Sequence, residues 1–187
     1  KSRSRGLGDV YKRQVGATGN VGRKTLEVLE KKELEIDNLY LVASSRSAGI
    51  KIKFRGKEYE VEELDSFDFS KAKIIFFAAG GKISEKFAEK ASKNSLVIDN
   101  SSFFRMDPDV PLIVPQVNKE DLDSIKKNII ANPNCSTAQL VIALKPLHDL
   151  FVIKRVVVST YQSVSGGGKA PMDELIEQTK FVLDGKK

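Results

Sequence analysis

The stretch Gly16-Ala17-Thr18-Gly19-Asn20-Val21-Gly22 decides the fold of this chain, because it places a glycine at every third position directly before an amphipathic segment. Glycines permit a tight turn and let the backbone approach a pyrophosphate, which is stabilised at the positive N-terminus of the next helix. The GxxGxxG spacing is related to the dinucleotide fingerprint without being its commonest form, and an ordinary strand-to-helix turn is the alternative. The position of the loop favours nucleotide binding.

Predicted strands and helices alternate downstream of this loop. Apolar runs and alternating patterns indicate strands at 39–43, 73–79, 96–99, 129–131 and 152–161, with a hairpin over 50–54 and 59–61. Apolar residues at mixed three-to-four spacing indicate helices at 21–32, 84–92, 119–127, 136–147 and 170–183. This alternation predicts an α/β fold with a Rossmann-like, doubly wound parallel sheet.

The loop after the second predicted strand indicates which nucleotide is bound. NAD sites usually carry an acidic residue there, which accepts a hydrogen bond from the ribose 2′-hydroxyl. This chain has Arg46 instead, between Ser45 and Ser47. An arginine with neighbouring hydroxyls suits a 2′-phosphate through charge-assisted hydrogen bonds, whereas a solvated arginine in a polar loop is the alternative. Together with the glycine loop, this pattern favours NADP over NAD.

Cys135 is the single cysteine, and it lies in a polar turn between a predicted strand and an apolar helix. A helix N-terminus stabilises a thiolate, and its first N–H groups can stabilise an oxyanion. The alternative is a small buried hydrophobe, but the Asn, Pro, Ser and Thr neighbours favour a nucleophile. His148 lies about 20 Å further along the same helix, so it is interpreted as a residue favoured by the C-terminal helix dipole.

Composition excludes several classes of protein. One cysteine excludes an internal disulfide, and Cys135 with His148 alone does not form a zinc site, so no metal is predicted. No apolar run approaches the ~18 residues of a membrane span. The formal charge of +6 is concentrated in residues 1–14, which hold five basic residues and one acidic residue. Because the remainder shows no basic stripe, nucleic acid is not an expected partner.

Both ends of the chain depart from the pattern expected of a complete native domain. Tyr11, Lys12, Arg13 and Gln14 precede the glycine loop, whereas a central parallel strand is normally apolar on both faces. We therefore predict that residues 1–14 are a non-native tail. The chain stops at residue 187 directly after a predicted helix, which predicts a fragment.

Six ordered blocks of the sequence resemble the N-terminal half of the aspartate-β-semialdehyde dehydrogenase family. They are 16–22, 45–49, 99–102 with 104–106, 114–118, 132–137 and 161–166. The resemblance covers nearly all of the chain after residue 14. It implies an NADP-binding Rossmann-like domain at 15–134, followed at 135–187 by the start of an incomplete α+β substrate and dimerisation domain.

The resemblance also implies an activity, namely the reversible NADPH-dependent reduction of L-aspartyl-4-phosphate to L-aspartate-4-semialdehyde and phosphate. This step serves lysine, methionine and threonine biosynthesis and is carried out by a cytoplasmic homodimer. Cys135 would form a thioester that hydride reduces, Arg105 and Asn134 would hold the substrate phosphate, and Gln162 would orient the substrate. The implied cofactor-binding residues are Gly16, Thr18, Gly19, Asn20 and Val21 in the glycine loop, Arg46 and Ser47 at the 2′-phosphate, and Ser165 and Gly166 near the nicotinamide.

Two departures from the family pattern qualify this resemblance. Gln116 stands where many relatives carry glutamate, so no role is assigned to it. The family's acid–base histidine and substrate-carboxylate arginine lie beyond residue 187, so this chain alone is expected to be inactive.

An N-acetyl-γ-glutamyl-phosphate reductase is the nearest alternative function, although its cysteine motif differs. A non-catalytic nucleotide-binding protein is a second alternative, against which Cys135 and Gln162 argue.

Overall fold

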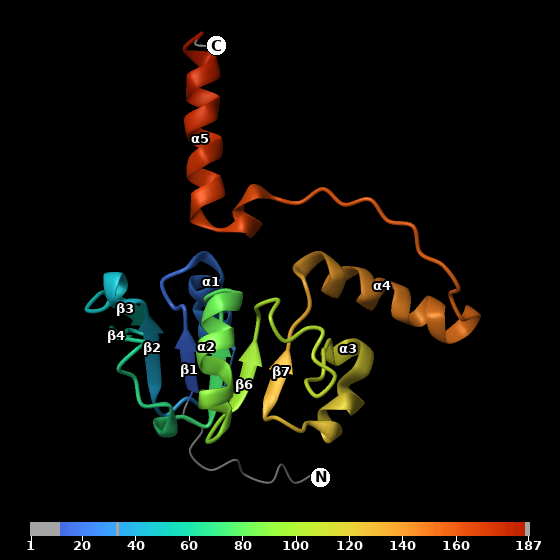
Figure 1. The fold of residues 1–187 in the computed structure, drawn as a ribbon, viewed down its shortest axis with the longest axis horizontal. Coiled ribbons are helices and arrows are strands. Elements are labelled where there is room, and N and C mark those ends of the chain that lie inside the picture. Colours follow the sequence, from blue (N-terminus) through green and yellow to red (C-terminus); the bar gives the residue numbers. More distant parts are fainter. Residues whose placement is uncertain (1–11, 33, 186–187) are drawn as a thin grey trace.

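A computed structural model describes residues 12–32 and 34–185, and its centre is a seven-stranded sheet of order β3-β4-β2-β1-β5-β6-β7 (Figure 1). The strands are β1 (Lys12–Val15), β2 (Leu39–Ala43), β3 (Lys51–Phe54), β4 (Lys57–Glu63), β5 (Ile74–Phe77), β6 (Leu96–Asp99) and β7 (Ile129–Ala131). All neighbouring strands pair in parallel except β3 and β4, which form an antiparallel hairpin. The predicted doubly wound parallel sheet is confirmed. Strand order reverses between β1 and β5, and sheets of this kind bind ligands at the carboxyl ends of the strands at such a point.

Helices connect the strands and extend the chain beyond the sheet. The α-helices are α1 (Asn20–Lys31), α2 (Gly81–Ser92), α3 (Pro115–Asn118), α4 (Cys135–Phe151) and α5 (Lys169–Leu183). Short 3-10 helices occur at η1 (Ser45–Ser47), η2 (Phe69–Lys71), η3 (Lys119–Ser124) and η4 (Val164–Gly167). Figure 1 shows α1 and α2 against the sheet, whereas α4 and α5 project away from it.

Two hydrophobic clusters cover the two faces of the sheet. Leu41 and Val42 are consecutive on β2 and point to opposite faces, and each belongs to a different cluster. The Leu41 cluster includes Leu26 and Leu29 of α1, and the Val42 cluster includes Phe87 of α2. Because both faces are buried, the sheet is a rigid platform for the loops that leave its carboxyl edge.

Most predicted elements near the sheet are confirmed, but the helix predicted at 119–127 is wrong. The chain forms the short helix α3 and then the 3-10 turn η3. Asn118 explains the interruption, because its side chain accepts from the Val114 N–H and donates to the Leu112 carbonyl and to Asp121. Such side-chain bonds to nearby backbone compete with a continuing helix.

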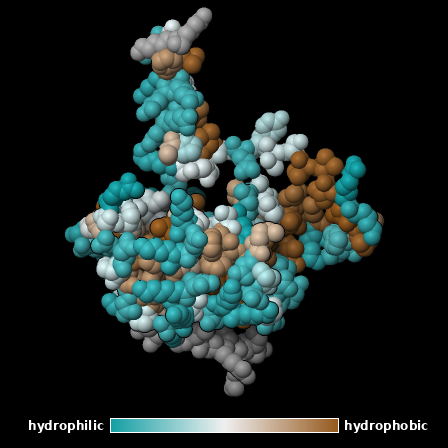
Figure 2. Space-filling model, viewed as in Figure 1, coloured by the Kyte–Doolittle hydropathy of each residue, from teal (hydrophilic) through white to brown (hydrophobic). Residues whose placement is uncertain are grey.

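The strand predicted at 152–161 is also wrong. Val152 caps α4 in the left-handed conformation, and the residues after it belong to no sheet among the described residues. Val157 and Tyr161 are 81% and 101% exposed. Their β-branched composition suits a strand, but a strand needs a neighbour to pair its backbone groups. Figure 2 shows hydrophobic surface gathered over α4, where Leu150 and Phe151 are also exposed.

The N-terminal prediction falls partly outside the described residues. Residues 1–11 are outside the structural description, whereas the backbone of Lys12–Val15 forms β1 at the centre of the sheet. Polar residues therefore occupy a strand that was expected to be apolar. The prediction that residues 1–14 are a non-native tail stays a prediction.

Candidate active site

The glycine loop makes a close turn from β1 into α1. Gly16 has φ +81°, and a side chain there would lie 2.8 Å from the carbonyl of Ala78. A Cβ on Gly22 would lie 2.1 Å from the Gly16 oxygen, so α1 and the loop touch backbone to backbone. Gly19 is the N-cap of α1 and offers no side chain to the first N–H groups of the helix. The first N–H groups of α1 therefore have no side-chain cap and can donate to an anion, while the assignment of a phosphate to this place stays a prediction.

A cavity of about 580 Å³ lies beside this loop, which is within the usual size range of ligand pockets. Its described lining residues are Gly16, Thr18, Gly19, Ala43, Ser44, Arg46, Leu64, Ala78, Ala79, Ile83 and Lys169. They come from the glycine loop, from the carboxyl ends of β2, β4 and β5, and from η1, α2 and the first residue of α5. Two of these side chains are cationic and none is acidic, so the residues present fit the phosphates of a dinucleotide.

The remaining predicted cofactor residues do not line this cavity but lie close in the chain to residues that line it. Thr18 Oγ1 donates to Ser47 Oγ at 3.4 Å, which joins the glycine loop to the turn η1 that carries Arg46. Asn20 and Val21 open α1. Ser165 and Gly166 lie in η4, where Ser165 Oγ is 2.7 Å from Ser163 Oγ. The structure thus groups the predicted phosphate-binding residues, whereas the nicotinamide assignments stay predictions.

Cys135 is exposed and begins the 17-residue helix α4, as the sequence predicted. Asn134 is the N-cap, and its side-chain oxygen accepts from the Ser136 N–H at 2.9 Å and the Ser136 hydroxyl at 2.6 Å. The Cys135 thiol also contacts this oxygen at 3.8 Å. Since Asn134 uses its oxygen as the cap, the amide nitrogen is the group left to donate to a phosphate.

Arg105 is half-buried and is fixed by backbone carbonyls close to the cysteine turn. Its Nε donates to the Asn132 carbonyl at 2.9 Å, and its Nη2 donates to the Asn100 carbonyl at 3.2 Å. The side chains of Asn132 and Asn100 hydrogen-bond to each other at 2.5 Å. This network links the residues after β6 and β7, so Arg105 is anchored near Cys135 and is more than a surface charge.

Asp99 is a buried carboxylate that sequence reasoning left without a role. Its carboxylate accepts from the Ser84 hydroxyl at 2.8 Å, the Ser101 N–H at 2.9 Å and the Ser101 hydroxyl at 2.7 Å. Three donors satisfy a charge that would otherwise be costly to bury. Asp99 therefore fixes α2 and the start of the loop that leads to Arg105.

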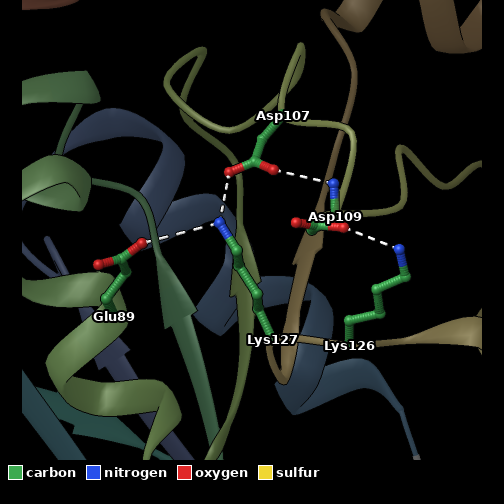
Figure 3. A network of polar contacts seen from close by, with 5 residues as sticks. All are labelled: Glu89, Asp107, Asp109, Lys126 and Lys127. Atoms are coloured by element: carbon green, nitrogen blue, oxygen red, sulfur yellow. Dashed lines mark hydrogen bonds and ion pairs between the residues drawn. The ribbon is translucent and has the colours of Figure 1, made fainter.

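A surface ion-pair network holds the other end of the same loop (Figure 3). Lys127 Nζ donates to the Asp107 carboxylate at 2.9 Å and lies 3.9 Å from Glu89 of α2. Asp107 also accepts from the Asp109 N–H at 2.9 Å, and Lys126 pairs with Asp109 at 2.8 Å. Asp107 is two residues from Arg105, so the network restrains the loop that carries the arginine.

The Asp107–Lys127 pair predicts a pH-dependent contribution to stability. The Lys127 bond, together with the Asp109 N–H, holds the pKa of Asp107 below its ordinary value of 3.8. A depressed carboxyl pKa contributes stability that is present above the unfolded pKa and lost as pH falls through the folded pKa. Urea unfolding should show Asp107→Asn less stable than wild type at pH 7, with the difference vanishing well below pH 3.8.

An exposed aspartate provides the control for this prediction. Asp123→Asn, on the exposed turn η3, should unfold like the wild type at pH 7. A difference between Asp107→Asn and wild type that persists unchanged at pH 2 would show that its origin is not the ionised pair.

Two sequence-predicted residues lie apart from the described interactions of Cys135. Gln162 is exposed on the extended segment before η4, and its amide lies 3.5 Å from Thr160 Oγ1. His148 lies in the last turn of α4, and its carbonyl accepts from the Val152 N–H. Its predicted place at the far end of the helix is confirmed, and the orienting role of Gln162 stays a prediction.

Residues 12–32 and 34–185 provide neither a metal site nor a membrane-spanning helix. No group of three or more metal-ligating side chains gathers in this part of the chain. None of its helices combines the length and the apolar character needed to span a membrane.

The sheet order, the glycine loop at its switch point and the exposed cysteine at a helix N-terminus define a Rossmann-type dinucleotide-binding protein with a candidate thiol nucleophile. Residues 14–125 match the family described as "Semialdehyde dehydrogenase, NAD binding domain", and residues 144–187 match "Semialdehyde dehydrogenase, dimerisation domain". The chain therefore belongs to the semialdehyde dehydrogenase family. The predicted order of an NAD(P)-binding domain and the start of a dimerisation domain is confirmed, and the boundary at 134 and 135 stays a prediction.

Within this family, the chain is similar to proteins named aspartate-semialdehyde dehydrogenase. The chain is 55% identical over 175 residues to an aspartate-semialdehyde dehydrogenase of Aquifex aeolicus, covering 92% of this chain and 52% of that protein. Aspartate semialdehyde dehydrogenase II of Vibrio cholerae, solved with ASA, is 48% identical with a TM-score of 0.91, covering 95% of this chain and 54% of that one. The Candida albicans enzyme solved with NADP is 33% identical with a TM-score of 0.63, covering 78% and 48%. The chain spans about half the length of the curated relatives it matches.

Proposed function

We propose that the protein, as its gene encodes it, catalyses the reversible NADPH-dependent reduction of L-aspartyl-4-phosphate to L-aspartate-4-semialdehyde and phosphate. The observation that carries the proposal is the exposed Cys135 thiol at the N-terminus of α4, beside the strand ends to which Arg105 is fixed. High identity to proteins named aspartate-semialdehyde dehydrogenase spans this region and supports the choice of substrate.

The first step is attack of the Cys135 thiolate on the acyl carbon of the substrate. A carbon–sulfur bond forms, the carbon–oxygen bond to phosphate breaks, and the departing phosphate takes up a proton from solvent. First-turn N–H groups of α4 can stabilise the negative charge on the attacked oxygen. Arg105 and the Asn134 amide hold the phosphate, because a guanidinium and an amide N–H both donate to its oxygens.

The second step reduces the thioester to the aldehyde. When bound, NADPH supplies the hydride that adds to the acyl carbon, and the thiolate of Cys135 leaves as the aldehyde forms. Gln162 orients the substrate, with its amide able to donate and to accept. In the reverse direction, phosphate cleaves the thioester and regenerates the thiolate.

The cofactor pocket favours NADP. The backbone N–H groups at the start of α1 bind the pyrophosphate, and Arg46 with Ser47 binds the 2′-phosphate. Ser165 and Gly166 lie on the nicotinamide side. The absence of an acidic side chain from the described cavity lining supports this preference, because a carboxylate would repel a 2′-phosphate.

The assembly proposed is a cytoplasmic homodimer with no nucleic-acid or membrane partner. Residues 144–187 match a dimerisation domain, and this region exposes large apolar side chains. They include Leu147, Leu150, Phe151, Leu175, Ile176, Phe181 and Val182. Apolar surface of this extent is normally covered by another part of the chain or by a second subunit.

The test is an assay of the gene-encoded protein with aspartate semialdehyde, inorganic phosphate and NADP, followed by absorbance of the reduced nicotinamide. NADPH should form only when phosphate is present, since phosphate must release the acyl group from Cys135. We expect kcat/KM to be about a hundredfold higher than with N-acetylglutamate semialdehyde, because the extra methylene and acetyl amide need space and partners.

Two other outcomes would decide against the proposal. Faster turnover of N-acetylglutamate semialdehyde would assign the protein to the reductase of that longer substrate. NADP binding without turnover of either aldehyde would indicate a nucleotide-binding protein that lacks the chemistry.

A further inference from the structure

Lys169 is the first residue of α5 and lies at the nucleotide cavity, far along the chain from the glycine loop. Figure 1 shows α5 beginning above the carboxyl edge of the sheet and α1. A contact fixes this placement, because the Asn20 amide nitrogen lies 3.5 Å from Met172 Sδ of α5. The start of α5 therefore touches the start of α1 at this point.

The position of Lys169 is electrostatically unfavourable for its own helix. A helix N-terminus carries partial positive charge and favours acidic side chains, whereas α5 begins with a lysine and has no acidic residue in its first turn. Part of the cost is offset by Asp173, whose carboxylate pairs with Lys169 one turn later. A lysine at this unfavourable place indicates that it binds a negatively charged ligand.

The charges around the cavity indicate what that ligand would carry. Arg46 and Lys169 are the cationic side chains among the described lining residues, and they come from separate elements, η1 and α5. The N-terminus of α1 adds a third source of positive potential between them. Arg46 was predicted from the sequence, whereas Lys169 was not, because it lies outside the glycine loop and its neighbours.

We propose that Lys169 is a second phosphate-binding cation of the dinucleotide pocket, contributed by the dimerisation segment. This inference rests on the proposed function, since it needs a phosphorylated dinucleotide in the cavity. The Lys169 ammonium leaves Asp173 and donates to a phosphate oxygen of the cofactor. Nucleotide binding thereby ties the start of α5 to the glycine loop, and Asp173 competes with the cofactor for the same cation.

Calorimetric titration of the gene-encoded protein with NADP and with NAD tests this proposal. Lys169→Ala should weaken NADP binding about tenfold, which is the usual worth of one charge-assisted hydrogen bond. The loss should shrink as salt is raised, because the lysine is largely exposed. Lys180→Ala is the matched control, since it removes the same charge from the same helix but does not line the cavity. Arg46→Ala is the positive control for loss of the 2′-phosphate contact.

The two nucleotides distinguish which phosphate Lys169 binds. A loss confined to NADP supports contact with the 2′-phosphate, and an equal loss with NAD supports contact with the pyrophosphate. Lys169→Ala binding as tightly as Lys180→Ala would overturn the proposal. So would full recovery of affinity in Lys169→Ala combined with Asp173→Asn, because the loss would then come from the unpaired aspartate. Failure of the wild type to bind either nucleotide would instead count against the proposed function.

Discussion

Replacing Cys135 with serine should reduce phosphate-dependent NADP reduction by the gene-encoded protein by about 10⁴-fold or more, as loss of a catalytic nucleophile does elsewhere. A cysteine sulfur is intrinsically a strong nucleophile, whereas a serine hydroxyl is weak unless a general base activates it. Within the described part of the chain, the partner of the Cys135 thiol is the Asn134 amide oxygen, which is not a base that could activate a serine. The measurement is the initial rate of NADPH formation with saturating semialdehyde and phosphate.

Two controls separate chemistry from folding in this variant. NADP affinity of Cys135→Ser should match that of the wild type within about twofold, because Cys135 does not line the nucleotide cavity. Alkylation of the folded wild type, followed on the peptide that contains Cys135, should proceed without denaturant, because the thiol is exposed. Activity that survives the serine substitution would contradict the thioester mechanism.

The sequence predicted the parts of the fold that local pattern controls. β2 and β6 were predicted to their end residues, because short apolar runs between polar loops leave little freedom of assignment. Three other local features were also predicted: the glycine loop, a helix that starts next to Cys135, and the turn with Arg46. Each depends on glycine conformation, helix capping or charge, and all three are encoded within a few residues.

The parts that were missed depend on contacts far apart in the chain. Residues 152–161 have strand-like composition, but the structure describes no strand beside them, and pairing cannot be inferred from one segment. The role of Asp99 depends on Ser84 of a different element. Lys169 becomes notable only when α5 is placed over α1, although a lysine directly after three glycines at a helix start was a signal. Such relationships belong to the tertiary structure.

Replacing Gly22 with alanine should destabilise the nucleotide-binding domain by about 3 kcal/mol, the upper part of the usual range for overpacking. The added Cβ would lie 2.1 Å from the Gly16 oxygen, 2.9 Å from the Gly16 carbonyl carbon and 3.0 Å from the Ala17 Cα. All three are backbone atoms, so no side chain can rotate away and α1 must move from the loop. That movement also displaces the N–H groups proposed to bind the pyrophosphate, and NADP affinity should fall at least about a hundredfold, or roughly 2.7 kcal/mol.

Gly81→Ala separates this steric effect from the general consequence of adding a methyl group. Gly81 begins α2 with an ordinary backbone conformation, and its added Cβ would meet Ser102 Oγ at 3.7 Å and Phe103 Cβ at 3.9 Å. Because a Gly→Ala change at such a site reduces the entropy of the unfolded chain, it should leave stability unchanged or raise it by about 0.5 kcal/mol. Urea unfolding and NADP titration of both variants provide the comparison. Gly22→Ala unfolding at the same urea concentration as Gly81→Ala, with NADP affinity equal to wild type, would contradict this prediction. The position of α1 would then not depend on backbone contact with the loop.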